Sequence, residues 1–210
     1  MQSLANRAAH EIRNPLNGLA LNLEVVRSRA ARGTGDLASI GRYADSASSE
    51  SERAAELVQA LLELARPLTE PVDLWSALRP MVVLHSAIAA AEALGAPRDD
   101  GDRSAHEVTL EPRGDAWLTV AADPIVSRLA LGTALDAAAK ARTPAIVRCS
   151  VEARAAGDGK TGGQVVAMLR CAAPAPKLDA AVRDAIEGGG VVLEAVPDGM
   201  MLTFRAAGRD

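Results

Sequence analysis

The chain has 210 residues, a formal net charge of −4 at pH 7, and hydrophobic and aromatic contents of 49% and 2%. This length allows one large domain or two small ones, and the composition predicts a core of Ala, Leu and Val rather than of rings. The negative charge argues against a nucleic-acid partner. No unbroken apolar run reaches the roughly 18 residues of a membrane span, and no apolar signal segment begins the chain. We therefore expect a cytoplasmic protein, with Cys149 and Cys171 reduced in strands.

Apolar residues recur every three or four positions through the first thirty residues, which predicts one long amphipathic helix. This stripe comprises Leu4, Ala8, Ile12, Leu16, Leu19, Leu23, Val26 and Ala30. A helix turns about 100° per residue, so His10 lies roughly 160–200° from the nearest stripe residues. We expect its side chain to point into solvent, with Asn14 and Asn17 on the same face.

Pro15 lies inside this predicted helix, where proline removes a backbone hydrogen bond at a cost of about 3 kcal/mol. One interpretation is that a helix begins at Pro15, because proline suits the first turn. The unbroken stripe from Leu4 to Val26 favours a single helix that bends just after His10.

A second helix is predicted after the link at 32–36, with Asp36 as its N-cap, and Arg66-Pro67 ends it. Its apolar stripe comprises Leu37, Ile40, Ala44, Ala47, Ser51, Ala54, Val58, Leu61 and Ala65. Two antiparallel helices cannot bury both stripes alone. They can pair with a second copy as a four-helix bundle, which we favour, or pack against the C-terminal half of the same chain.

The rest of the chain reads as mixed helices and strands, which together predict an α/β sandwich. Helices are expected at Asp73–Leu94, interrupted by Pro80, at Ile125–Ala141 after Asp123-Pro124, and at Lys177–Glu187. Strands are expected at Val108–Leu110, Trp117–Val120, Ala145–Ala153, Gln164–Cys171, Val191–Ala195 and Met200–Arg205. The overall fold class is therefore α+β, with a hairpin domain at 1–67 and a sandwich domain at 68–210.

Several short motifs have competing interpretations. His10-Glu11 is not a zinc-peptidase motif, because the second histidine that this motif needs is Asn14. His85 and His106 have no ligand-like neighbours and are expected to be structural or on the surface. The Gly159-Lys160-Thr161 segment lacks the upstream glycine of a phosphate-binding loop, since position 154 is Arg, so we expect a hairpin loop. Gly188-Gly189-Gly190 is expected to end a helix and turn into a strand.

The segment from Ser3 through His10-Glu11-Ile12-Arg13-Asn14-Pro15-Leu16 resembles the phospho-acceptor box of two-component histidine kinases. The resemblance implies that His10 carries a phosphoryl group on its imidazole and that the helical hairpin dimerises. It also implies that Glu11 orients the imidazole and that Asn14 occupies the position that places water for receiver dephosphorylation. Arg13 and Asn17 are candidates for contacts with a partner, although a solvated surface arginine is an equal alternative for Arg13.

Residues 68–210 resemble the ATP-binding domain of the same kinases, but the nucleotide motifs are altered. Gly132 and Asp136 stand where the family's two asparagines belong, and Cys171 is the best candidate for the position of the missing adenine-binding Asp. No glycine-rich lid is evident between Pro176 and Gly188. The resemblance therefore implies a degenerate domain that binds no cofactor.

The combination of an intact acceptor box and a degraded nucleotide site favours a histidine phosphotransferase of a phosphorelay. Such a protein exchanges phosphoryl groups with receiver domains of response regulators, and the Mg²⁺ is expected on the receiver. A free imidazole titrates near about pH 6.5, so an exposed histidine is mostly neutral at pH 7. Two alternatives stay open: a divergent sensor kinase or a fragment of one, and a non-catalytic dimeric scaffold or receiver phosphatase.

Overall fold

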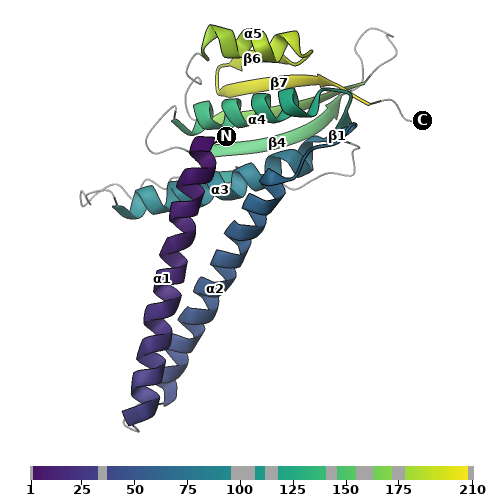
Figure 1. The fold of residues 1–210 in the computed structure, drawn as a ribbon. Helices are drawn as coiled ribbons and strands as arrows, with labels where there is room; N and C mark the ends of the chain where they lie inside the picture. The colour runs from purple at the N-terminus through teal and green to yellow at the C-terminus, as the bar shows by residue number, and fades with distance from the viewer. Residues whose placement is uncertain are drawn as a thin grey trace.

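The computed structural model describes residues 2–32, 37–95, 107–111, 118–140, 146–154, 163–171 and 178–207. Two long helices, α1 (Gln2–Arg32) and α2 (Leu37–Ala65), form an antiparallel hairpin that projects from a mixed α/β domain. The N-terminus of α1 lies at the junction with that domain, and the other end of the hairpin is far from it (Figure 1). The predicted α+β class is confirmed. The predicted N-cap Asp36 lies outside the described residues.

Helix α1 is continuous through Pro15, so a helix start at this proline is wrong. Proline has no N–H, so the carbonyl of Glu11, one turn earlier, lacks its usual helical donor. The ring of Pro15 is buried. The hairpin is fastened near its far end by Arg29, which donates to Ser39 Oγ and lies 4.9 Å from the ring centroid of Tyr43.

Within the single chain, the predicted stripe of α2 is buried at Ala47 and Ala54 and exposed at Leu37, Ala44, Ser51 and Val58. The buried residues at the C-terminal end of α2 are Leu57, Ala60 and Leu64, one position before the predicted ones. They belong to the same buried cluster as residues of α3 (Leu74–Gly95), and the start of α1 joins it through Leu4 and Ala8. The junction end of the hairpin therefore packs against the chain's own C-terminal domain.

Large apolar side chains stay exposed elsewhere on the hairpin of the single chain. Leu16 and Leu23 on α1 are 48% and 51% exposed, and Val58 and Leu62 on α2 are 42% and 53% exposed. Packing within the chain is thus confirmed for the junction end of the hairpin, and pairing with a second copy stays a prediction. The junction end is covered within the chain, whereas these four residues remain available for another surface.

The C-terminal domain is a two-layer arrangement of helices on one face of a five-stranded sheet. The strands are β2 (Glu107–Leu110), β4 (Ile146–Arg154), β5 (Gln164–Cys171), β7 (Gly199–Arg205) and β6 (Val192–Val196), in that spatial order. Only the β2–β4 pair is parallel. Helix α3 contacts β2, α4 (Pro124–Lys140) contacts the central strands, and α5 (Ala180–Gly188) contacts β6. This arrangement confirms the predicted sandwich.

Alternation along the strands explains why the helices cover one face. Val147 and Cys149 on β4, and Leu169 on β5, are fully buried. Arg148, between the first two, and Arg170, which follows Leu169, are exposed. Side chains alternate between the two faces of a sheet, so the buried set faces the helices and the charged set faces away from them. Both cysteines are buried in strands as thiols, as predicted.

A two-stranded sheet, which the sequence did not predict, connects the hairpin to the domain. Strand β1 (Val72–Asp73) pairs antiparallel with β3 (Thr119–Val120). Asp73 was predicted to begin a helix, and its carboxylate instead caps α3 from outside, accepting from the backbone N–H of Trp75 at 3.1 Å. The predicted domain boundary near residue 67 falls between the end of α2 and this strand.

Helix α3 is continuous through Pro80, so the predicted interruption is wrong. Its segment Leu74–Ala91 is long and apolar enough to cross a membrane by length and composition alone, with 56% of that window buried within the protein. The core helix of a globular domain passes the same test, and α3 packs against α1, α2, α4 and β2. His85, predicted to be structural, is buried on this helix. His106 lies outside the described residues.

Candidate functional site

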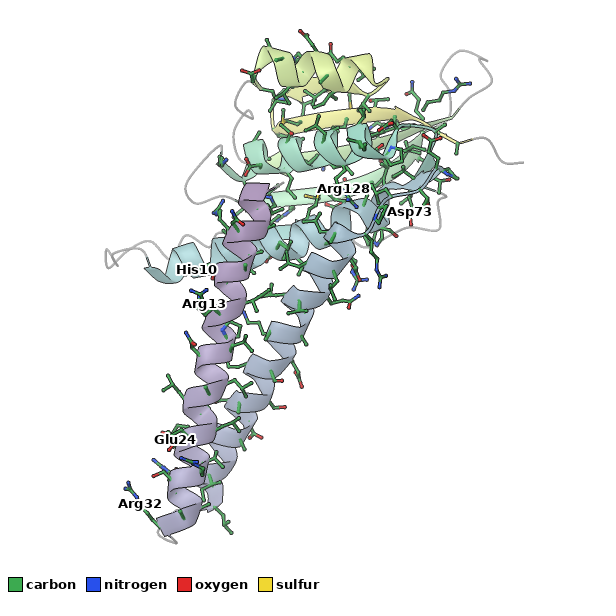
Figure 2. All side chains as sticks on the ribbon, in the orientation of Figure 1. His10, Arg13, Glu24, Arg32, Asp73 and Arg128 are labelled. Carbon is green, nitrogen blue, oxygen red and sulfur yellow. The ribbon has the colours of Figure 1, made fainter. Side chains whose placement is uncertain are left out.

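His10 lies on the outer surface of α1, close to where the hairpin meets the C-terminal domain (Figure 2). Its side chain is 67% exposed, whereas the side chain of Glu11 is only 14% exposed. The adjacent stripe residue Ala8 is buried in the junction core. The helical geometry that places Ala8 inward therefore places His10 in solvent, as the sequence predicted.

Glu11 connects His10 and Asn14 through its two carboxylate oxygens. His10 Nδ1 lies 3.2 Å from Glu11 Oε1, and Asn14 Nδ2 donates to Glu11 Oε2 at 3.0 Å. A carboxylate only accepts hydrogen bonds, so this contact favours the tautomer with the proton on Nδ1. The lone pair of the ring then lies on Nε2. This atom is not engaged by Glu11 and is available for reaction.

Arg13 and Asn17 also have exposed side chains on α1. Figure 2 shows Arg13 just below His10 along the hairpin. Asn17 is seven residues after His10, so the two share a face of the helix. The five predicted residues of the hairpin are thus all on α1, within two turns, and Glu11 joins two of them directly.

The C-terminal positions predicted to be degenerate are not gathered into a comparable site. Gly132 is buried within α4. Asp136, one turn later, accepts from Lys140 Nζ at 2.6 Å in an ion pair within the helix. Cys171 is buried at the end of β5, and the segment that follows it at 172–177 lies outside the described residues, as does Gly159-Lys160-Thr161. The strands on either side of the latter segment, β4 and β5, pair antiparallel.

Gly188-Gly189-Gly190 ends α5 and turns into β6, as predicted. The backbone N–H of Gly190 donates to the carbonyl of Glu187 at 2.9 Å, and that of Val191 donates to Ile186 at 3.3 Å. Gly190 has a φ of +82°, which favours glycine. These amides therefore bind the helix's own carbonyls.

A family comparison agrees with the acceptor-box resemblance of the N-terminal segment. Residues 1–70 match the model of the His Kinase A (phospho-acceptor) domain. The helical hairpin is a histidine-kinase-like phospho-acceptor domain. This match covers a third of the chain and leaves the C-terminal domain outside it. No curated protein matches the chain.

Arg128 is a contact between the two parts that the sequence did not suggest. Its Nη2 donates to the backbone carbonyl of Arg66 at 2.6 Å, so α4 holds the residue that directly follows α2. Partial burial lowers the pKa of Arg128, because desolvation disfavours the charged form. This contact and the buried cluster around Leu57 fix the hairpin against the C-terminal domain, with His10 exposed beside the junction.

Proposed function

We propose that this chain is a histidine phosphotransferase of a phosphorelay, which exchanges phosphoryl groups with receiver aspartates through His10 and uses no ATP. The phospho-acceptor family acts in two-component signalling with response regulators. The single observation that carries the proposal is the exposed imidazole of His10 with Nδ1 held by Glu11. This geometry presents Nε2 to a partner rather than to the chain's own core.

The transfer step follows from that geometry. The Nε2 lone pair attacks the phosphorus of the receiver's aspartyl phosphate, the N–P bond forms, and the P–O bond to the aspartate breaks. The aspartate leaves as a carboxylate, which needs no proton. The ring becomes cationic as it is phosphorylated, and the adjacent Glu11 carboxylate stabilises that charge or accepts the Nδ1 proton. The Mg²⁺ that neutralises the phosphoryl oxygens is expected on the receiver.

The proposal that ATP is not the donor rests on the residues of α4. The helix has Gly132 and the Lys140-paired Asp136 at the positions where the family's nucleotide-binding asparagines are expected. A buried glycine has no side chain to donate or accept, and Asp136 lacks the amide donor of an asparagine. These substitutions favour transfer from a receiver over autophosphorylation.

A homodimer completes the proposed architecture. Phospho-acceptor domains of this family usually dimerise, and Leu16, Leu23, Val58 and Leu62 are exposed on the hairpin. Burying such residues against a second copy removes apolar surface from water. The dimer would be the predicted four-helix bundle. We expect it to act in the cytoplasm and to bind neither nucleic acid nor membranes.

Receiver dephosphorylation is a second candidate function, favoured by Asn14. Glu11 fixes the amide nitrogen of Asn14 one turn from His10 on the exposed face. The amide oxygen is then free to accept from a water molecule that attacks a docked aspartyl phosphate. A His10→Ala variant separates the two functions, because it removes transfer but leaves Asn14 able to promote hydrolysis.

The test supplies label from two sources. One sample of the chain is incubated with radiolabelled ATP. A second sample is incubated with receiver domains that were labelled by radioactive acetyl phosphate. We expect acid-labile label on the peptide that contains His10 from at least one receiver and none from ATP. Label from ATP would instead identify a divergent kinase, and label from neither source across the receiver set would contradict phosphotransfer.

A further inference from the structure

A cavity of about 610 Å³ lies where α2, α3 and β2 meet, apart from the face that carries His10. Its lining includes Arg53 and Glu56 of α2, Trp75 and Arg79 of α3, and Leu110 of β2. Helix α3 runs across the end of the hairpin beneath the sheet (Figure 1), and it lines the cavity together with α2 and β2. Its volume falls within the range of about 300–1,000 Å³ that is typical of small-molecule sites.

The walls of this cavity are apolar. Val82 and Val83 of α3 line it together with Val108 of β2 and Leu57 of α2. Val82, Val108 and Leu57 are buried members of the core cluster, so the floor is formed by packed, positioned side chains. Trp75 adds a half-buried ring. Such walls favour a ligand with an aromatic or branched aliphatic body.

Two guanidinium groups stand at the edge of the cavity without a partner among the described residues. Arg53 and Arg79 are exposed, and neither makes an ion pair or hydrogen bond in the described part of the chain. Glu56 is the acidic residue of the lining, so the positive groups outnumber it two to one. Planar guanidinium groups bind carboxylates, phosphates and sulfonates through paired N–H donors.

We propose that this cavity binds a small anionic amphipathic molecule, whose apolar body rests on Trp75 and Val83 and whose anionic group is held between Arg53 and Arg79. The two arginines belong to different parts of the protein, α2 of the hairpin and α3 of the C-terminal domain. A ligand held by both therefore bridges the junction. The site is distinct from that of the proposed phosphotransfer, because its lining comes from α2, α3 and β2 and includes no residue of α1.

Along the axis of the hairpin, the cavity lies at about the same level as the acceptor residues of α1. A Cβ on Gly18 would lie 3.4 Å from the Glu50 side chain, which sets Gly18 of α1 opposite Glu50 of α2. The helices run antiparallel, so Arg53 and Leu57 stand roughly level with Pro15 and Glu11. A ligand in the cavity would thus stiffen the hairpin at the level of the acceptor residues, from the side of α2.

The test compares two fluorescent probes with nearly the same apolar body, the anionic anilinonaphthalene sulfonate and the uncharged phenylnaphthylamine. We expect the sulfonate to bind one site per chain, at least about tenfold more tightly than the uncharged probe. Equal affinities, or binding of the sulfonate that does not saturate at one site, would overturn the proposal.

Variants locate the site. The double variant Arg53→Gln and Arg79→Gln should weaken sulfonate binding at least about tenfold and leave the uncharged probe unaffected. Both residues are exposed, so the fold should persist, as checked by circular dichroism. Arg42→Gln, an exposed arginine of α2 outside the cavity, is the matched control and should leave binding unchanged. Unchanged binding in the double variant, or equal losses in the control, would place the probe elsewhere.

A second variant tests the cavity itself rather than its charge. Ala87→Phe places a ring in the half-buried lining and should exclude both probes. Binding of the sulfonate with full affinity to a folded Ala87→Phe protein would also overturn the proposal.

Discussion

The helical hairpin and the C-terminal domain differ in how they hold the residues predicted to be functional. On α1, His10 is 67% exposed and its neighbour Glu11 joins it to Asn14. On α4, Gly132 is buried and Asp136 is occupied by Lys140 of the same helix. The buried residues of α4 are small or aliphatic and serve packing. Under the proposed function, reactivity belongs to the hairpin, and the described part of the C-terminal domain supports and orients it.

The strongest test of this contrast is His10→Ala. We expect transfer from a labelled receiver to fall to the background level, because the nucleophile is lost, while the helix content stays unchanged, since the side chain is exposed. The measurement is label on the chain after mixing with the phosphorylated receiver. Arg42→Ala, an exposed change on α2, is the control. Transfer that survives in His10→Ala would move the acceptor away from this residue.

The largest expected effect on stability lies in the other region. Leu135 of α4 is fully buried in the core cluster, so Leu135→Ala should lower the free energy of unfolding by about 2–5 kcal/mol. Ile125→Ala on the same helix is the matched control, because Ile125 is 78% exposed, and it should change stability by less than about 0.5 kcal/mol. Urea unfolding measures both. Equal losses would mean that α4 is not the packing helix that its burial indicates.

The same contrast explains what the sequence could predict. Periodicity located α1, α2, α4 and most strands to within a few residues, because each has one face against a core. The exposure of His10 followed from its angle relative to Ala8. The sequence did not reveal β1, because two residues that pair with the distant Thr119–Val120 carry no local pattern. Nor did it place the buried residues at the end of α2, because Leu57 and Leu64 belong to a cluster that includes residues of the distant α3 as well as of α1.

Contacts between distant segments were the least predictable. The bond from Arg128 to the carbonyl of Arg66 joins residues 62 positions apart, and no spacing rule suggests it. The cavity likewise combines Arg53, Arg79 and Leu110 from three elements. The residues of the candidate acceptor site were found because they lie within two turns of one helix, where sequence spacing determines spatial arrangement directly.

The apolar residues left exposed on the hairpin can be tested through assembly. Leu16→Gln combined with Leu62→Gln should weaken the proposed dimer at least about tenfold, because each buried leucine contributes roughly 1.5–3 kcal/mol. Sedimentation velocity at several protein concentrations measures the change. Ile125→Gln, an exposed apolar residue of the C-terminal domain, is the control and should leave the association unchanged. A wild-type chain that stays monomeric would contradict the dimer itself.

The connection between the two regions can be loosened at one bond. Arg128→Gln removes the donor to the Arg66 carbonyl, and we expect a loss of about 1 kcal/mol in the free energy of unfolding. Hydrogen exchange should increase at the end of α2 but not in the sheet. Arg42→Gln, at an exposed position of α2 away from the junction, is the control, with an expected effect within about 0.5 kcal/mol. Faster exchange throughout the sheet would show that Arg128 supports the whole domain rather than the junction.

The smallest expected effect is also the sharpest check on the C-terminal domain. The Asp136–Lys140 pair is short at 2.6 Å, but its side chains are 44% and 63% exposed, so water screens it and its contribution should be about 0.3–0.5 kcal/mol. Asp136→Asn should therefore lower stability by no more than that at low salt, less at high salt, and leave transfer from the receiver unchanged. Thermal unfolding at two salt concentrations and the receiver-labelling assay measure the two effects. If Asp136 instead held a catalytic metal, its substitution would abolish labelling in a protein that is still folded. Such a result would place essential chemistry in the domain to which the proposed function assigns only packing and orientation.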